Sequence, residues 1–214
     1  LKEPGLVPID EVRGGHDKFW NRAMFPIMDV HNRVIGFGGR VMGEGEPKYL
    51  NSPETKIFDK SRNLYGLNFA RTTKKPQFLL CEGYMDVIGM HQVGVENVVA
   101  SSGTALTQGQ IRLIHRFTNN ITVLYDGDAA GIKAALRGID MLLEEGMNVK
   151  VVLLPAGEDP DSFARSHSAS EFAEFISQNE TDFIRFKTKL LLAEAGSDPI
   201  KRSALISDII RTVA

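Results

Sequence analysis

The sequence predicts an α/β fold: a parallel four-stranded sheet flanked by helices, between an N-terminal mixed α+β basic subdomain and a C-terminal helical subdomain. Two observations predict the sheet: four continuous apolar runs occur in the middle of the chain, and segments with a helical pattern separate them. Continuous apolar runs are typical of parallel strands buried on both faces. Strand–helix–strand repeats favour parallel pairing through right-handed crossovers. The runs are QFLLC (77–81), NVVAS (97–101), ITVLY (121–125) and VKVVLLP (149–155).

The other elements follow from periodicity and turn residues. Two apolar segments on either side of Asp29–Arg33 predict a β-hairpin near the start of the chain. Three glycines in its second arm, Gly36, Gly38 and Gly39, either accommodate a bulge or let a phosphate or base approach the backbone; taken alone, they favour the bulge. Helices are expected over 84–93, 107–117 and 129–145, and later over 169–176, 181–193 and 199–214. The expected domains are 1–75, 76–162 and 163–214.

The composition is that of an ordinary globular protein, since 43% of the 214 residues are hydrophobic and 24% are charged. No apolar stretch approaches the roughly 20 residues that a membrane-spanning helix needs, and no signal peptide is visible. Cys81 is the only cysteine, which excludes an internal disulfide, and we expect its thiol to be buried rather than catalytic. These features favour a reducing, cytoplasmic setting without a membrane partner. Because the chain begins with Leu1, we expect a piece of a longer protein.

Acidic residues follow three of the four apolar runs. They are Glu82 with Asp86, Asp126 with Asp128, and Asp159 with Asp161. Because ligands of open parallel sheets bind beyond the carboxyl ends of the strands, we expect these carboxylates to gather along one edge. Asp126 and Asp128 project to the same side of an extended chain. Glu82 and Asp86 stack on one face if a helix begins after Gly83.

Crowded carboxylates raise each other's pKa values, and a divalent cation removes that penalty. Magnesium bound by carboxylates alone is typical of phosphate chemistry. Each acidic pair also has a simpler interpretation, because an Asp between a strand and a helix often caps the helix. Capping therefore stays open for Asp128, Asp159 and Asp161 taken singly. The combination of Glu82, Asp126 and Asp128 is what predicts the metal site.

Charge is distributed unevenly along the chain. Residues 1–81 carry 13 Lys and Arg against 9 Asp and Glu, whereas residues 82–161 carry 5 against 11. The loop 46–67 interleaves basic residues (Lys48, Lys56, Lys60, Arg62) with aromatic ones (Tyr49, Phe58, Tyr65). This mixture suits single-stranded nucleic acid or nucleotides, although a solvated basic face would look the same.

Three of these motifs together resemble a known domain. The EGYMDV segment, YDGDxAG at 125–131 and GEDPD resemble the Toprim domain that primases, topoisomerases and related nucleases share. The segments FPIMDVHNRVIGFGGR and PKYLNSPET are similar to the RNA-polymerase core of bacterial replicative DNA primases of the DnaG type. The resemblance covers about residues 20–165.

The resemblance implies an enzyme that joins NTPs into short RNA primers on a single-stranded DNA template, by attack of a ribose 3′-hydroxyl on an α-phosphate. It implies that Mg²⁺, with Mn²⁺ as a substitute, binds the principal carboxylates Glu82, Asp126 and Asp128. Further acidic positions of the family are Asp86, Asp159 and Asp161. Residues in segments implicated in nucleotide and nucleic-acid binding are Arg40, Lys48, Tyr49, Asn51 and Lys60.

Other properties of the family are expected to lie outside this chain. The ligands of its zinc-binding domain are missing, so we expect no zinc here, and the domain that binds the replicative helicase is also missing. Two alternatives remain. The first is a Toprim topoisomerase or nuclease. A topoisomerase would need a tyrosine nucleophile, for which Tyr49, Tyr65, Tyr84 and Tyr125 are candidates, although Tyr84 and Tyr125 sit inside the acidic motifs and look like packing residues. A module that binds nucleic acid or nucleotides without polymerising them is the second.

Overall fold

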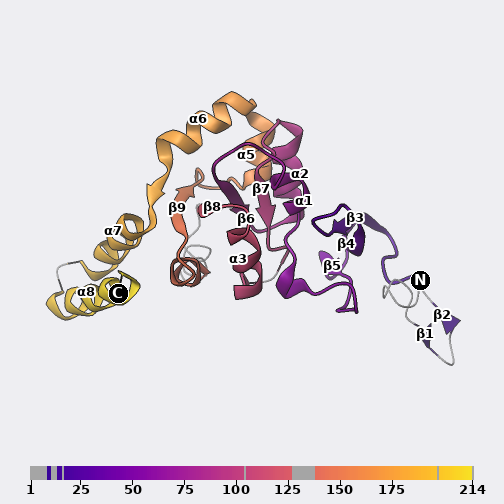
Figure 1. The fold of residues 1–214 in the computed structure, drawn as a ribbon, viewed down its shortest axis with the longest axis horizontal. Helices are drawn as coiled ribbons and strands as arrows, with labels where there is room; N and C mark the ends of the chain where they lie inside the picture. The colour runs from indigo at the N-terminus through magenta and orange to yellow at the C-terminus, as the bar shows by residue number, and fades with distance from the viewer. Residues whose placement is uncertain are drawn as a thin grey trace.

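The computed structural model describes residues 9–10, 14–15, 17–103, 105–126, 138–196 and 198–213. A five-stranded sheet forms the centre, with a three-stranded sheet on one side and a pair of long helices on the opposite side (Figure 1). The fold is therefore α/β with helices flanking a mainly parallel sheet, as the apolar runs predict.

The central sheet has the strand order β10-β9-β8-β6-β7. Its parallel strands are β6 (Phe78–Cys81), β7 (Val98–Ala100), β8 (Asn120–Tyr125) and β9 (Asn148–Leu153). All four coincide with the predicted runs. A fifth strand, β10 (Thr181–Asp182), pairs antiparallel with β9 and was not predicted, because two residues are too short to show a pattern.

Alternate residues of these strands enter two separate cores. Leu80 and Val123 face one core, which α1 (Leu67–Ala70), α3 (Gln108–His115), helical residues 138–144 and α7 (Phe183–Ala195) complete. Leu79 and Leu124 face the other, against α2 (Tyr84–Gln92), α5 (Pro160–Ser166) and α6 (Ala169–Asn179). Burial on both faces explains why β6 and β7 are apolar throughout.

Most of the predicted helices are present. Helix α8 (Pro199–Val213) packs against α7, and both were expected. Of the helix expected over 129–145, residues 138–144 are helical and 129–137 lie outside the described residues. Helix α5 was not predicted, because its first residues looked like a turn around Pro160, which instead occupies the first helical position. No described helix has the length and apolar character needed to cross a membrane.

The N-terminal part contains the expected hairpin. Strands β3 (Arg22–Met28) and β4 (Val34–Val41) pair antiparallel, and β5 (Tyr49–Asn51) adds a third strand. Asn32 takes the left-handed conformation in the turn, with φ of 62°. The short strands β1 (Ile9–Asp10) and β2 (Gly14–Gly15) precede the hairpin, and the 3₁₀ helix η1 (Lys60–Arg62) lies in the basic loop.

The three glycines of β4 serve packing as well as a bulge. The register shifts between the pairs Ile27–Gly36 and Met28–Val34, which confirms an irregularity next to Gly36. A Cβ on Gly38 would lie 2.7 Å from Cζ of Tyr84, and one on Gly39 would lie 2.7 Å from Cδ1 of Phe19. Aromatic rings thus occupy the space that side chains at these positions would need. Tyr84 comes from α2, so Gly38 lets the hairpin approach the central domain.

We predict that Gly38→Ala destabilises the chain by about 1–3 kcal/mol, because the added methyl overlaps the buried ring of Tyr84. Urea unfolding of the 214-residue chain measures the change. Gly138→Ala is the control, since its Cβ would meet Leu106 at an ordinary 3.7 Å and alanine favours the helix. Equal stability of the Gly38 variant and the wild type would contradict the packing argument.

Candidate metal and nucleic-acid site

Two acidic residues lie at neighbouring strand ends. Glu82 directly follows β6 and Asp126 directly follows β8, and both side chains are exposed. The two strands pair in parallel with Leu80 opposite Val123, so their carboxyl ends meet at the same edge of the sheet. The structure thus brings Glu82 and Asp126 together as expected. Asp128 lies outside the described residues.

Asp86 lies near this pair, in the first turn of α2. Its carboxylate accepts a 2.8 Å hydrogen bond from the backbone N–H of Gly83, which caps the helix. Burial raises the pKa of Asp86 to about 6, and the negative charges of Asp159, Asp126 and Asp161 add to the rise against the Gly83 hydrogen bond. Four carboxylates from three segments therefore share one neighbourhood. Glu82 precedes the helix, so it does not stack on Asp86.

Asp159 and Asp161 both have structural partners. Asp159 caps α5, because its Oδ1 accepts a 2.7 Å hydrogen bond from the backbone N–H of Ser162. Asp161 is buried and pairs with Arg165 at 2.5 Å. A Cβ on Gly89 of α2 would overlap Oδ1 of Asp161, so α2 and α5 pack closely at this point. Capping, the simpler alternative, is confirmed for Asp159.

The donor set fits a hard divalent cation. It consists of carboxylate oxygens, which Mg²⁺ prefers. Within the described ranges, no three His, Cys, Asp or Glu side chains stand close enough to hold one ion. Glu82 and Asp126 would supply two ligands, and Asp128, two residues beyond Asp126, is the expected third. Burial is the main cause of the raised pKa of Asp86, and the neighbouring negative charges that add to it are ones a cation would offset.

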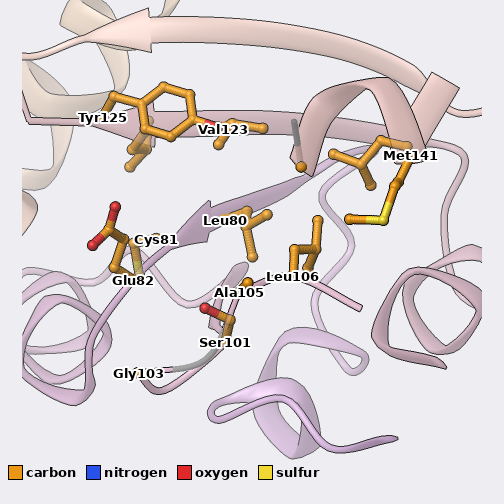
Figure 2. Close-up of a pocket in the computed structure, with 13 residues that line it drawn as sticks. Leu80, Cys81, Glu82, Ser101, Gly103, Ala105, Leu106, Val123, Tyr125 and Met141 are labelled. Carbon is orange, nitrogen blue, oxygen red and sulfur yellow. The ribbon is translucent and has the colours of Figure 1, made fainter. Parts of the chain in front are cut away.

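A largely apolar cavity of about 580 Å³ adjoins this edge. Figure 2 shows Glu82 at one end of the cavity and Met141 at the other, with Leu80 between them. Cys81 also lines it, but its thiol is buried and donates to the carbonyl of Val99, and burial raises its pKa. The thiol is therefore a packing group, as the sequence predicts.

Basic and aromatic residues of β5 and its surroundings lie beside the acidic edge. Lys48 and Arg40 are exposed, and the Arg40 guanidinium lies 6.0 Å from the ring centroid of Tyr49. Burial raises the pKa of Tyr49, Arg40 opposes the rise, and Asp86 adds to it. Tyr49 thus lies within electrostatic reach of both charge clusters, as the charge distribution along the chain predicts.

The basic loop is anchored on α3. The buried side chain of Gln110 donates to the carbonyls of Lys60 and Asn63 at 3.1 and 2.9 Å. Thr107 Oγ1 donates to the carbonyl of Ser61 at 2.6 Å. These contacts fix the backbone of η1, so Lys60 projects from a fixed position. Sequence reasoning missed Gln110 and Thr107, although their spacing is that of a helix capping box.

Asn51 and Tyr84 form a further contact between the two sheets. The Tyr84 hydroxyl donates to Asn51 Oδ1 at 2.8 Å, and Asn51 Nδ2 donates to the carbonyl of Ser102 at 3.1 Å. Tyr84 is 2% exposed and Tyr125 7%, and burial raises both pKa values. Both tyrosines are packing residues, as predicted.

We predict that Asp159→Ala destabilises the chain by about 1 kcal/mol, whereas Asp159→Asn does not, because asparagine keeps the cap of α5 without the charge. Urea midpoints of the two variants and the wild type provide the comparison. An equal loss in both variants would instead assign the stabilisation to the charge of Asp159.

Two family models match the chain. One, described as Toprim-like, matches residues 79–164, and the other, described as the N-terminal domain of the DNA primase catalytic core, matches residues 1–71. The DNA primase of Clostridium acetobutylicum is 46% identical over 188 residues, which are 87% of this chain and 31% of that protein. The DNA primase of Staphylococcus epidermidis is 41% identical over 99% of this chain and 36% of its own length. The chain thus spans about a third of these relatives.

Solved structures extend the similarity to the fold. The catalytic core of the Escherichia coli primase superposes with a TM-score of 0.87 at 39% identity, over 99% of this chain and 70% of that one. A DnaG primase catalytic domain bound to single-stranded DNA gives the same score and identity, over 99% and 71%.

Proposed function

The chain belongs to the family of DnaG-type DNA primases, and from that premise we propose that it contributes the metal site and template surface for RNA primer synthesis on single-stranded DNA. One observation carries the proposal: the exposed carboxylates of Glu82 and Asp126 lie at adjacent strand ends, beside a fixed basic loop. Acidic and basic surfaces so close together suit a polyanionic substrate whose reacting phosphate needs a cation.

We assign Glu82, Asp126 and Asp128 as the principal Mg²⁺ ligands, and Mn²⁺ is expected to substitute. A cation held by these residues would lower the pKa of the attacking ribose 3′-hydroxyl and would neutralise charge on the α-phosphate of the incoming NTP. Asp86 adds negative charge behind the two exposed ligands. Asp159 caps the start of α5, and its negative charge adds to the raised pKa of Asp86.

The basic side holds the polyanions. Lys48, Arg40 and Lys60 are placed to contact template phosphates or the NTP triphosphate, and Tyr49 offers a ring on which a base can stack. The RNA primer would leave along the same surface. A replicative helicase is the expected partner of the full-length protein, and we expect a cytoplasmic location because the proposed template is replicating DNA.

A competing Toprim topoisomerase would require a nucleophilic tyrosine. Tyr84 and Tyr125, the two closest to the acidic motifs, are buried with raised pKa values, so neither offers an accessible phenolate. Binding without synthesis remains the second candidate for this chain, because it spans about a third of its relatives.

We predict that Glu82→Gln and Asp126→Asn each lower primer synthesis by about 100-fold or more, because each removes a charged ligand at nearly constant volume. The assay supplies single-stranded template, labelled NTPs and Mg²⁺ or EDTA to the full-length polypeptide. Unchanged thermal unfolding of the variants shows that the fold survives.

Glu96→Gln is the matched control, since Glu96 is an exposed glutamate outside the acidic edge. Full synthesis by the Asp126 variant would contradict the metal assignment. Template binding by the wild type without any synthesis would favour the binding module.

We predict that Lys48→Ala and Lys60→Ala weaken single-stranded DNA binding and reduce the salt slope of log K by about 0.7 for each phosphate that the variant no longer neutralises. Fluorescence anisotropy between low and physiological salt measures the slope. Lys201→Ala on α8 is the control, since that exposed lysine lies on the distant helix pair. An equal effect of all three variants would indicate non-specific attraction.

A further inference from the structure

Asn51 lies in the segment expected to bind nucleic acid, but its carboxamide already has protein partners at both ends. Oδ1 accepts from the Tyr84 hydroxyl at 2.8 Å, and Nδ2 donates to the Ser102 carbonyl at 3.1 Å. Asn51 is only partly exposed. These two hydrogen bonds fix the Asn51 side chain in one orientation. Its effect on the site therefore depends on which residues Tyr84 and Ser102 hold in place.

Both partners of Asn51 lie next to Glu82, Ser102 by a hydrogen bond and Tyr84 along the chain. The backbone N–H of Ser102 donates to the carbonyl of Glu82 at 3.0 Å. Ser102 has a φ of 60°, a left-handed conformation that serine rarely adopts and that its surroundings must hold. Asn51 binds the carbonyl of this same residue, so it braces the loop that fixes the Glu82 backbone.

Tyr84 approaches Glu82 from the other direction, two residues along the chain. Its ring stacks on Phe25 with centroids 5.2 Å apart and meets the edge of Tyr65 at 4.7 Å. Asn51 pairs with Gly38 across the β-sheet, and Gly38 is the residue that makes room for the Tyr84 ring. The N-terminal sheet therefore holds Tyr84 by packing and by the Asn51 hydrogen bond together.

We propose that Asn51 is a positioning residue that joins the two segments in contact with Glu82, the start of α2 at Tyr84 and the loop after β7 at Ser102, and so sets the place of the Glu82 carboxylate beside Asp126. The proposal rests on the proposed function, since it assumes that these two carboxylates bind the cation. Ligands held by such outer contacts bind metal more tightly than ligands that must be ordered on binding. Asn51 would thus make metal affinity depend on the docking of the N-terminal sheet.

The test uses Asn51→Leu, which is close to isosteric, and Tyr84→Phe, which keeps the buried ring and loses only the hydroxyl. Each variant, and the double variant, is made in the full-length polypeptide. Mn²⁺ binding is followed by electron paramagnetic resonance, and single-stranded DNA binding by anisotropy in EDTA. We expect Tyr84→Phe to weaken Mn²⁺ binding by about five-fold, the effect of one lost hydrogen bond, and Asn51→Leu, which loses both of its bonds, to weaken it further. The double variant should lose less than the product of the two, because both changes break the same brace.

The DNA measurement separates positioning from direct contact. Tyr84 is too buried to touch DNA, so Tyr84→Phe should leave DNA affinity unchanged. Lys48→Ala is the opposite control, with weaker DNA binding and unchanged Mn²⁺ binding. Weaker DNA binding by Asn51→Leu with unchanged Mn²⁺ affinity would overturn the proposal and make Asn51 a nucleic-acid contact.

Two further measurements guard the interpretation. If Asn51→Leu fails to fold, Tyr84→Phe decides alone, and normal Mn²⁺ affinity in that variant overturns the proposal. Glu82→Gln reports separately on the proposed function. If it binds Mn²⁺ like the wild type, the metal assignment fails, whatever Asn51 does; if it loses Mn²⁺ while the Asn51 and Tyr84 variants keep it, only the positioning proposal fails.

Discussion

The parallel pairing of β6 with β8 is the constraint on which the rest of the site depends. Backbone hydrogen bonds set Leu80 opposite Val123, and that register decides that Glu82 and Asp126 leave the sheet at the same edge. A strand in the opposite direction would carry Asp126 to the far end of the sheet. Both faces of β6 and β8 are buried in separate cores, so a one-residue slip would exchange the two sets of side chains at a large cost.

The acidic edge acquires its surroundings through contacts between the two sheets. Tyr84 enters a small core with Phe25, Ile27 and Phe58, which come from the N-terminal part. Gln110 of α3 holds the basic loop through hydrogen bonds to the carbonyls of Lys60 and Asn63. Because these contacts are hydrogen bonds and ring packing, they hold the acidic and basic surfaces beside each other without using the charged groups themselves.

Regular elements were predictable wherever burial imposed a pattern. The four parallel strands and α6, α7 and α8 follow their apolar periodicity closely. Helix α5 and strand β10 escaped, since one is seven residues long behind a proline and the other has two residues. The glycines of β4 were only partly understood. Their spacing indicated a bulge, but nothing local to β4 says that the Tyr84 ring, far along the chain, fills the space above Gly38.

The sequence by itself predicted the acidic edge. Carboxylates that follow parallel strands leave the sheet at the same edge, and their oxygens suit a divalent cation. Only the tertiary structure showed which protein partner each of these site residues has. It makes Asp159 a helix cap and pairs Asp161 with Arg165, and it turns Asn51 toward Tyr84 and Ser102. Spacing along a chain fixes which strand end a residue occupies, whereas a side chain's partner depends on contacts between segments distant in sequence, which no local pattern records.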